Sequence, residues 1–283
     1  MEKQYFYRKH IRGIQKVMPI ALVALAALYI AAAVLLLLAV NSIDIRIKLV
    51  LLGVGTVITT FIIIEGILIW FFFRRFTKVN ITLTEDYIIY KNIKGETKIA
   101  VDEIRKLEFP SIKYTGGWLK IVHPGGNIRL TVVLEGIGSF LKELKAILDR
   151  KDKQNTYDPK AMFSFYKTAE FADQSWERLY SIFTKLLLLI GLNLLIGILF
   201  FLVSGDLPMK GMWVLASFAL PALTYSAAEF VIATAIAKKS DEAAFEVPGR
   251  DYSFEGKVYR NTILIYSLLY LFVSVILLIL SYL

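Results

Sequence analysis

Two glutamates lie inside long apolar runs. Of all the residues in the chain, these two are the most suggestive of a functional site, because a carboxyl group inside a membrane span needs a special reason to be there. Glu65 lies about nine residues before Arg74. Glu229 lies the same distance before Lys238. In a helix this spacing is about 13 Å, which puts both carboxyl groups near a bilayer midplane. A charge there costs at least about 2.5–3.5 kcal/mol, so each group must be protonated, paired or in a wet cavity. Two interpretations stay open: a proton- or cation-linked site shared by two helices, or neutral acids that hydrogen-bond between helices and fix their packing.

Two further polar residues lie in the third apolar run. Lys185 is about one turn inside this run, where its side chain can reach back toward the headgroups, with Glu65 or Glu229 as the alternative partner. Asn193 lies deeper and is expected to bond a neighbouring helix. Both are interpreted as packing residues.

Catalytic motifs are missing from the sequence. The chain has no cysteine, which excludes disulfides, thiolate metal sites and cysteine nucleophiles. Its only histidines are His10 and His123, and no histidine or carboxylate cluster has metal-ligand spacing. There is neither a Walker-type phosphate loop nor a Gly-x-Ser-x-Gly motif. We therefore expect a protein that is not an enzyme and needs no cofactor or metal.

The elements that hold these residues are membrane spans. Hydrophobic residues make up 57% of the chain, above the roughly 45–50% of soluble domains. A span needs about 20 apolar residues. Five runs reach that length: 18–40, 49–73, 181–203, 212–236 and 262–283. The fold class predicted is a multi-pass α-helical membrane protein with five transmembrane helices and a cytoplasmic α+β domain.

The basic residues predict an orientation. The net charge of +9 is concentrated in the N-terminal arm, at Arg74-Arg75 and at Lys238-Lys239, while the loops 41–48 and 204–211 hold few cations. The positive-inside rule then puts the N-terminus, the middle domain and residues 237–261 in the cytoplasm, with the C-terminus outside. Contact with anionic lipids accounts for the basic surplus, and nucleic acid is not an expected partner.

Between the second and third spans the texture changes to short alternating strands. Strands are predicted at 79–83, 87–90, 98–101, 107–114, 118–123 and 128–134, with a hairpin turn at Pro124–Asn127. Ser139 is expected to cap a helix whose apolar stripe runs from Phe140 to Leu148. The predicted division is an arm and first hairpin (1–77), a cytoplasmic domain (78–151), a linker with an amphipathic helix (152–180), a second hairpin (181–239), a cytoplasmic segment (240–261) and a fifth span (262–283).

The order of these elements resembles the bacterial pleckstrin-homology (PH-like) domain of YcxB-like membrane proteins. The resemblance covers residues 18–150, with a helical hairpin followed by "ITLTEDYIIYKN", "IAVDEIRKLEF", "LKIVHPGGNIRL" and "FLKELKAIL". Eukaryotic PH domains hold phosphoinositides with a basic first hairpin, whereas the turn here, Thr84-Glu85-Asp86, is acidic. The resemblance therefore implies a non-catalytic module that docks a peptide, a protein neighbour or the membrane surface.

The second and fourth spans share a pattern at a constant offset. Glu65 matches Glu229, and the basic pair at 74–75 matches the pair at 238–239. Duplication of a helical hairpin and chance similarity between apolar helices are both open.

The segment 165–183 has one continuous apolar face at helical spacing. Trp176, Arg178 and Tyr180 are typical interfacial residues, so we expect this helix to lie in the membrane interface and run into the third span. The alternative is that the face packs on the PH-like domain. The residues from Tyr7 to Met18 have the same pattern before the first span.

The leading hypothesis is a non-enzymatic scaffold or accessory subunit of the bacterial inner membrane. Its cytoplasmic PH-like domain would dock a membrane-protein partner, or the chain would form a homo-oligomer. The alternative is a transport or bacteriocin-immunity protein that uses Glu65 and Glu229 for proton, cation or peptide passage. A third hypothesis, a lipid-modifying enzyme, requires a wet pocket that joins Lys185 or the glutamates to the headgroups.

Overall fold

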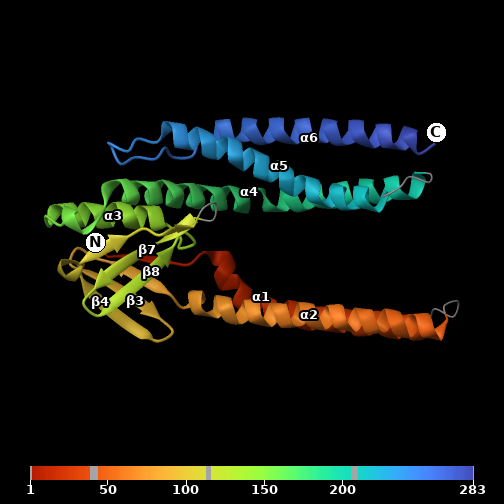
Figure 1. Ribbon diagram of the computed structural model, residues 1–283, viewed down its shortest axis with the longest axis horizontal. Coiled ribbons are helices and arrows are strands. Elements are labelled where there is room, and N and C mark those ends of the chain that lie inside the picture. The colour runs from red at the N-terminus through yellow and green to blue at the C-terminus, as the bar shows by residue number, and fades with distance from the viewer. Residues whose placement is uncertain (1, 39–43, 113–115, 205–209, 283) are drawn as a thin grey trace. The chain divides into compact units, whose positions relative to one another are not determined.

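The computed structural model describes residues 2–38, 44–112, 116–204 and 210–282 of the chain. It divides into two compact units (Figure 1). The first, here the sheet unit, comprises residues 1–110 and 117–158. The second, the three-helix unit, comprises residues 159–283 together with 111–116, which include the short strand β6 (Ser111–Ile112). Residues 39–43, which cover the end of the predicted first span and the start of the loop 41–48, residues 205–209 in the predicted loop 204–211, and residues 113–115, which include the end of the predicted strand 107–114, lie outside the described residues.

Five helices in the described residues are long and apolar enough to cross a membrane. They are α1 (Lys9–Leu38), α2 (Ile45–Thr77), α4 (Pro159–Val203), α5 (Lys210–Lys239) and α6 (Tyr252–Leu280). The prediction of five apolar helices is thus confirmed. Local signals set several ends: Asp44 caps α2 by accepting a 2.7 Å bond from the backbone of Arg46, and Asp251 caps α6 by accepting one from Phe254.

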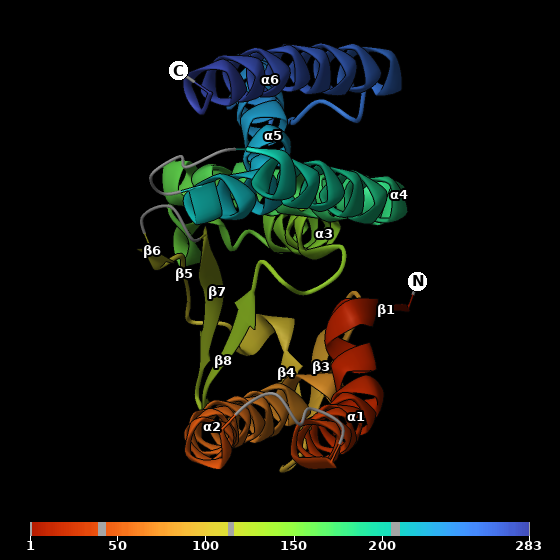
Figure 2. The same ribbon diagram turned by 90° about the vertical axis from the view of Figure 1, so that its right-hand side faces the viewer.

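Helices α1 and α2 form a hairpin and lie side by side (Figures 1 and 2). Polar bonds join them at several levels, and near one end the Lys48 ammonium of α2 donates to the Leu37 carbonyl of α1 at 3.3 Å. The hydroxyl of Tyr29 donates to the Leu52 carbonyl at 2.8 Å, and Gln15 and Trp70 exchange side chain–backbone bonds of 2.9 and 3.2 Å. Each of these bonds uses a side chain that would otherwise lack a partner in lipid, so together they stabilise the pairing without an ion pair between the two helices in the described residues.

The first sheet of the sheet unit contains a strand that the sequence did not predict. The order of strands in this sheet is β1-β2-β3-β4, and all neighbours are antiparallel. The strand β2 spans Asn80–Leu83, β3 spans Tyr87–Asn92 and β4 spans Gly95–Ala100. The edge strand β1 (Lys3–Phe6) comes from the basic N-terminal arm and pairs with β2. Tyr7 and Ile11, which follow it, are buried. The first half of the arm's apolar face is therefore buried in protein, which favours the alternative interpretation there, while Ile14 and Met18 are only half-buried.

The second sheet and a helix complete the unit. The strand β7 (Gly116–His123) pairs antiparallel with both β5 (Lys106–Glu108) and β8 (Gly126–Thr131). Short 3-10 helices lie at Val101–Glu103 and Gln154–Thr156. Helix α3 (Ile137–Arg150) buries its predicted stripe, including Phe140 and Leu144. The predicted cap was wrong: α3 begins two residues before Ser139, after Gly136, whose φ of 72° favours glycine.

In the three-helix unit, α4 continues without a break for 45 residues, or about 67 Å, roughly twice the hydrocarbon thickness. Its N-terminal half buries Phe163, Phe165 and Ala169. Between α5 and α6, a turn closed by the Asp241–Glu246 bridge presents Phe245 to α4, where its ring stacks on Tyr166 at 4.7 Å. The apolar face that the sequence favoured as interfacial is therefore buried in protein over this stretch.

Candidate functional site

A buried arginine organises the three-helix unit. The side chain of Arg178, on α4, is only 1% exposed and meets Glu229, on α5, through two parallel bonds. Its Nε donates to Glu229 Oε1 at 2.7 Å and its Nη2 to Oε2 at 2.9 Å. This bidentate geometry is the strongest pairing that a guanidinium makes with a carboxylate. Glu229, one of the two glutamates that the sequence places inside a span, is therefore paired within its own unit.

The third helix adds a second carboxylate to the same arginine. Arg178 Nη1 donates to Oε1 of Glu255, in the first turn of α6, at 3.0 Å. Arg250, just before α6, holds the other side of Glu255, with Nη2–Oε2 at 2.6 Å. Tyr259, one turn further along α6, donates its hydroxyl proton to Glu229. We call Arg178, Glu229, Arg250, Glu255 and Tyr259 the ion cluster.

The segment that carries Arg250 is itself fixed to α4. Gln174 donates a 2.8 Å bond to the carbonyl of Pro248, and the guanidinium of Arg250 lies 4.6 Å from the ring centre of Tyr252. The hydrogen bonds to Glu255 are the largest cause that raises the pKa of Arg250 above its usual value. Arg250 therefore keeps its charge at every pH at which the protein would be studied.

The hydrogen-bonding groups of the ion cluster are taken up by one another. Two guanidinium groups face the two buried carboxylates of Glu229 and Glu255, whose side chains are at most 10% exposed, and Arg250 also contacts the exposed Glu177 at 3.4 Å. A carboxylate that already accepts bonds from arginine is a poor general base, and neither arginine can act as an acid near neutral pH. The arrangement clamps α4, α5 and α6 together and holds no reactive group in an open site.

The other predicted residues lie apart from the ion cluster. Glu65 is exposed on α2, and Lys185 is exposed on α4, and neither makes a hydrogen bond or ion pair within the described residues. Asn193 is buried and donates to the Leu189 carbonyl of its own helix at 2.8 Å, beside a hollow of only about 10 Å³. The interhelical bond predicted for Asn193 is thus replaced by one within α4.

The three predicted interfacial residues separate in the structure. Tyr180 is 45% exposed and Trp176 is half-buried, with their ring centres 6.0 Å apart. Arg178, by contrast, is buried, which corrects its predicted role: its guanidinium is taken up by two carboxylates and does not face headgroups. Its position in the sequence beside two aromatic residues misled the prediction.

Sequence reasoning missed three members of the ion cluster. Arg250 and Glu255 lie in a short segment with other charges, and Tyr259 precedes the fifth span. One signal was present: Glu255 and Tyr259 are four residues apart, so they share a helix face. That face meets Glu229 only because of the way α5 and α6 pack, which no local pattern reports.

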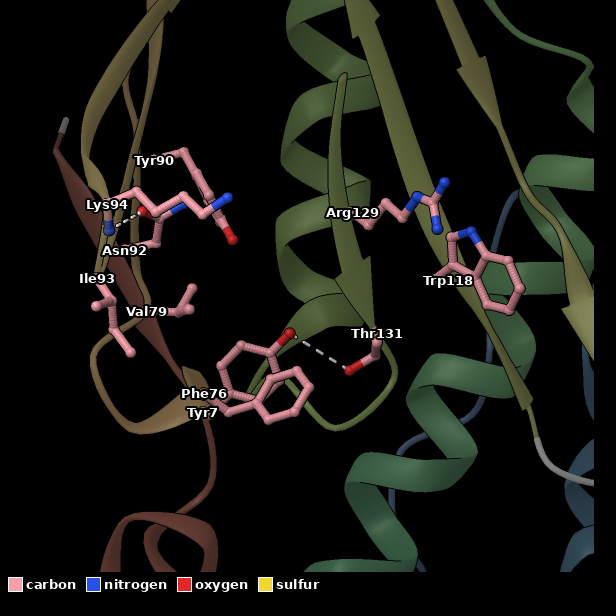
Figure 3. Close-up of a pocket in the computed structure, with 10 residues that line it drawn as sticks. All are labelled: Tyr7, Phe76, Val79, Tyr90, Asn92, Ile93, Lys94, Trp118, Arg129 and Thr131. Carbon is pink, nitrogen blue, oxygen red and sulfur yellow. Dashed lines mark hydrogen bonds between the residues drawn. The ribbon is translucent and has the colours of Figure 1, made fainter. Parts of the chain in front are cut away.

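A larger cavity lies in the sheet unit. It is a cleft of about 600 Å³ where the two sheets separate (Figure 3). Tyr7 and Phe76 lie at its base, Tyr90, Asn92 and Lys94 on one side, and Trp118, Arg129 and Thr131 on the other. Phe76 is in the last turn of α2, and Tyr7 lies two residues before α1. The cleft therefore opens where the two helices of the hairpin leave the sheets.

The cleft has cationic and aromatic walls and no acidic ones. Arg129 and Lys94 are exposed and line it, and no aspartate or glutamate does. Burial is the largest cause that raises the pKa of Tyr7, so its phenol is neutral. Within the described residues no three His, Asp or Glu side chains are grouped to hold a metal ion. The cleft thus has the chemistry of a binding site for an apolar group with a negative charge.

Comparison of the chain with family models, with curated proteins and with solved structures finds no match. The resemblance to bacterial PH-like proteins therefore stays a prediction.

Proposed function

We propose that the chain is a non-enzymatic scaffold or accessory subunit of a membrane assembly in the bacterial inner membrane, and that its sheet unit is a PH-like module that binds a protein partner. Two sheets followed by a C-terminal amphipathic helix are the architecture that the PH-like proposal requires. The ion cluster supports a structural role for the charged residues of the three-helix unit, because it leaves them no free acid or base.

The observation that carries the docking proposal is the edge of the first sheet. In the described part of the chain, β4 pairs only with β3, so its outer side presents backbone N–H and C=O groups without a strand partner. Tyr87, whose ring centre lies 3.8 Å from the ammonium of Lys98 on β4, is 40% exposed beside this edge. An extended segment of a partner can add to such an edge, with backbone bonds for affinity and apolar side chains for specificity.

The absence of cysteine makes a precise test possible. Lys98→Cys puts a single thiol on β4, and Lys142→Cys puts one on the exposed side of α3 as the matched control. Both full-length variants are treated in native membranes with a thiol-reactive photocrosslinker, purified under denaturing conditions and analysed by mass spectrometry. We expect one stoichiometric adduct from position 98 and none from position 142. The same faint products from both positions would contradict docking at β4, and a chain-to-chain adduct would indicate a homo-oligomer.

Transport through Glu65 and Glu229 is the alternative proposal. It requires Glu229 to exchange its partners, and the hollow beside the ion cluster measures only about 40 Å³, room for very few waters. Loss of proton- or cation-coupled uptake in vesicles upon Glu65→Gln and Glu229→Gln, with the fold preserved, would favour this alternative over the scaffold.

A further inference from the structure

We infer that the cleft of the sheet unit binds one anionic phospholipid from the surrounding bilayer. Its phosphate group would lie against Lys94 and Arg129, and an acyl chain would run past Ile93 onto the apolar surface of α2. This site goes beyond the proposed protein docking, because it uses the gap between the sheets and not the outer edge of β4.

The first argument is a continuous path from the cleft to a membrane-spanning helix. A second hollow, of about 320 Å³, is lined by Phe71, Phe72 and Arg74 of α2 together with Ile93. Ile93 also lines the cleft, so the two hollows meet at this residue. Phe71 and Phe72 are more than half exposed and lie in the apolar part of α2. A molecule in the cleft can therefore extend past Ile93 and Arg74 onto the apolar side chains of α2.

The second argument is the charge along this path. Arg74, Lys94 and Arg129 are exposed, and none has an ion-pair partner within the described residues. Elsewhere in the sheet unit, many cations are paired. Examples are Lys3 with Glu143, Lys120 with Glu108, Lys145 with Asp149, and Lys151 with Asp86. Cations left without carboxylates around an apolar cleft are complementary to a phosphate.

The third argument is that the remaining parts of a phospholipid also fit the lining of the hollows. Phe76, Val79 and Trp118 give the cleft an apolar lining near the cations, which suits the glycerol backbone and the first methylene groups of a lipid. A third hollow of about 260 Å³ continues from Tyr90, Asn92 and Arg129 toward His123 and Asn127, where polar groups can contact a headgroup. The order along the path is thus apolar, cationic and polar, the same order as in a phospholipid.

An acidic peptide would satisfy the cations but not the continuation along α2. Its backbone would need hydrogen-bond partners beside Phe71 and Phe72, where the helix presents only side chains. The resemblance to eukaryotic PH domains gives no guidance here either, because the site that those domains use is occupied by the acidic turn Glu85-Asp86.

The test is a lipid titration of the purified full-length chain in a neutral detergent, with bound lipid counted by native mass spectrometry. The probes are phosphatidylglycerol and phosphatidylcholine with identical acyl chains. We expect one phosphatidylglycerol to bind at least about tenfold more tightly than phosphatidylcholine. Replacing both cations, Lys94→Ala with Arg129→Ala, should weaken this binding about 25-fold, at about fivefold for each cation. The matched control, Lys91→Ala with Lys142→Ala, removes two exposed cations outside the hollows and should change it less than threefold.

A second variant tests the path itself. Ile93→Asp puts a negative charge where the two hollows meet, on an exposed side chain outside the core, and should abolish the preference for phosphatidylglycerol. Equal binding of both lipids, an equal loss in the control pair, or a polypeptide bound in place of lipid would each overturn the proposal. None of these outcomes affects the crosslink at β4, so failure here is distinguishable from failure of the proposed function.

Discussion

The glutamates of α2 and α5 occupy matching positions in two helical hairpins, and their surroundings differ. Glu229 is held by Arg178 of α4 and Tyr259 of α6, whereas Glu65 is exposed, with no partner in the described residues. The α1–α2 hairpin is joined by neutral bonds such as that of Tyr29 to Leu52 and by the Lys48 ammonium on the Leu37 carbonyl, with no carboxylate in these links. The three-helix unit is joined by buried ion pairs as well as by neutral bonds such as that between Ser217 and Tyr270. Similar sequence positions thus serve different roles, because a buried charge needs partners from helices that only the second unit supplies.

The largest effect is expected at Arg178. Arg178→Met leaves Glu229 and Glu255 buried beside each other with fewer donors, so the free energy of unfolding should fall by about 3–5 kcal/mol. Unfolding in detergent, followed by circular dichroism, measures this. Arg260→Met, an exposed position on α6, is the matched control and should stay within about 0.5 kcal/mol. A loss below about 1 kcal/mol at position 178 would mean that the ion cluster does not hold the helices.

The same substitution at both glutamates compares the hairpins directly. Glu229→Gln removes the charge that receives two arginine bonds and should cost about 2–3 kcal/mol. Glu65→Gln changes an exposed side chain and should cost less than about 0.5 kcal/mol in detergent. Parallel unfolding curves give both numbers. Equal costs at the two positions would contradict the difference between the units and would revive a shared role.

Helix contact offers a comparison that involves no charge. A methyl group added at Gly197 of α4 would lie 2.8 Å from Cβ of Ser217 on α5, close to the backbone, and Gly197→Ala should cost about 1–3 kcal/mol. At Gly66 of α2 the added group meets the flexible end of Leu22, which can move, so Gly66→Ala should cost less than about 1 kcal/mol. Gly191→Ala, with open space around it, is the control for helix propensity. The reverse order of costs would mean that α1 and α2 are the more rigid pair.

Alkaline pH should affect the sheet unit through buried tyrosines, among them Tyr5 and Tyr7. Burial is the largest cause that raises the pKa of Tyr5 and of Tyr7, so both stay neutral in the folded state above pH 10.0, where free tyrosine ionises. The unfolded chain then releases protons that the folded chain keeps, and stability falls as pH rises from about 10, by up to about 1.4 kcal/mol per pH unit for each tyrosine.

Unfolding of the full chain between pH 9 and 11.5 measures this slope. The double variant Tyr5→Phe with Tyr7→Phe should make it shallower, with the contribution of Tyr157, whose pKa burial also raises, remaining; Tyr282→Phe, at an exposed tyrosine, should leave it unchanged. An unchanged slope in the double variant would assign the alkaline sensitivity to other groups.

Elements with a strong local pattern were predicted well. The five apolar helices follow from run length alone, because a bilayer-spanning helix must be apolar over about 20 residues. The strands at 80–83, 87–92 and 126–131 follow from alternation and from turns such as Pro124-Gly125. The N-terminal strand Lys3–Phe6 was missed, since a short charged strand at a sheet edge has no pattern of its own and depends on β2 for pairing.

The sequence by itself determined the helices, most strands and the presence of a glutamate inside an apolar run, because each depends on neighbours in the chain. Only the tertiary structure decided that Glu229 is paired and Glu65 is not, since the partners Arg178 and Tyr259 come from other helices. The cleft, too, depends on where two sheets separate, and its cations come from β8 and from the turn before β4. Burial and pairing are properties of side chains distant in sequence, so packing alone sets them.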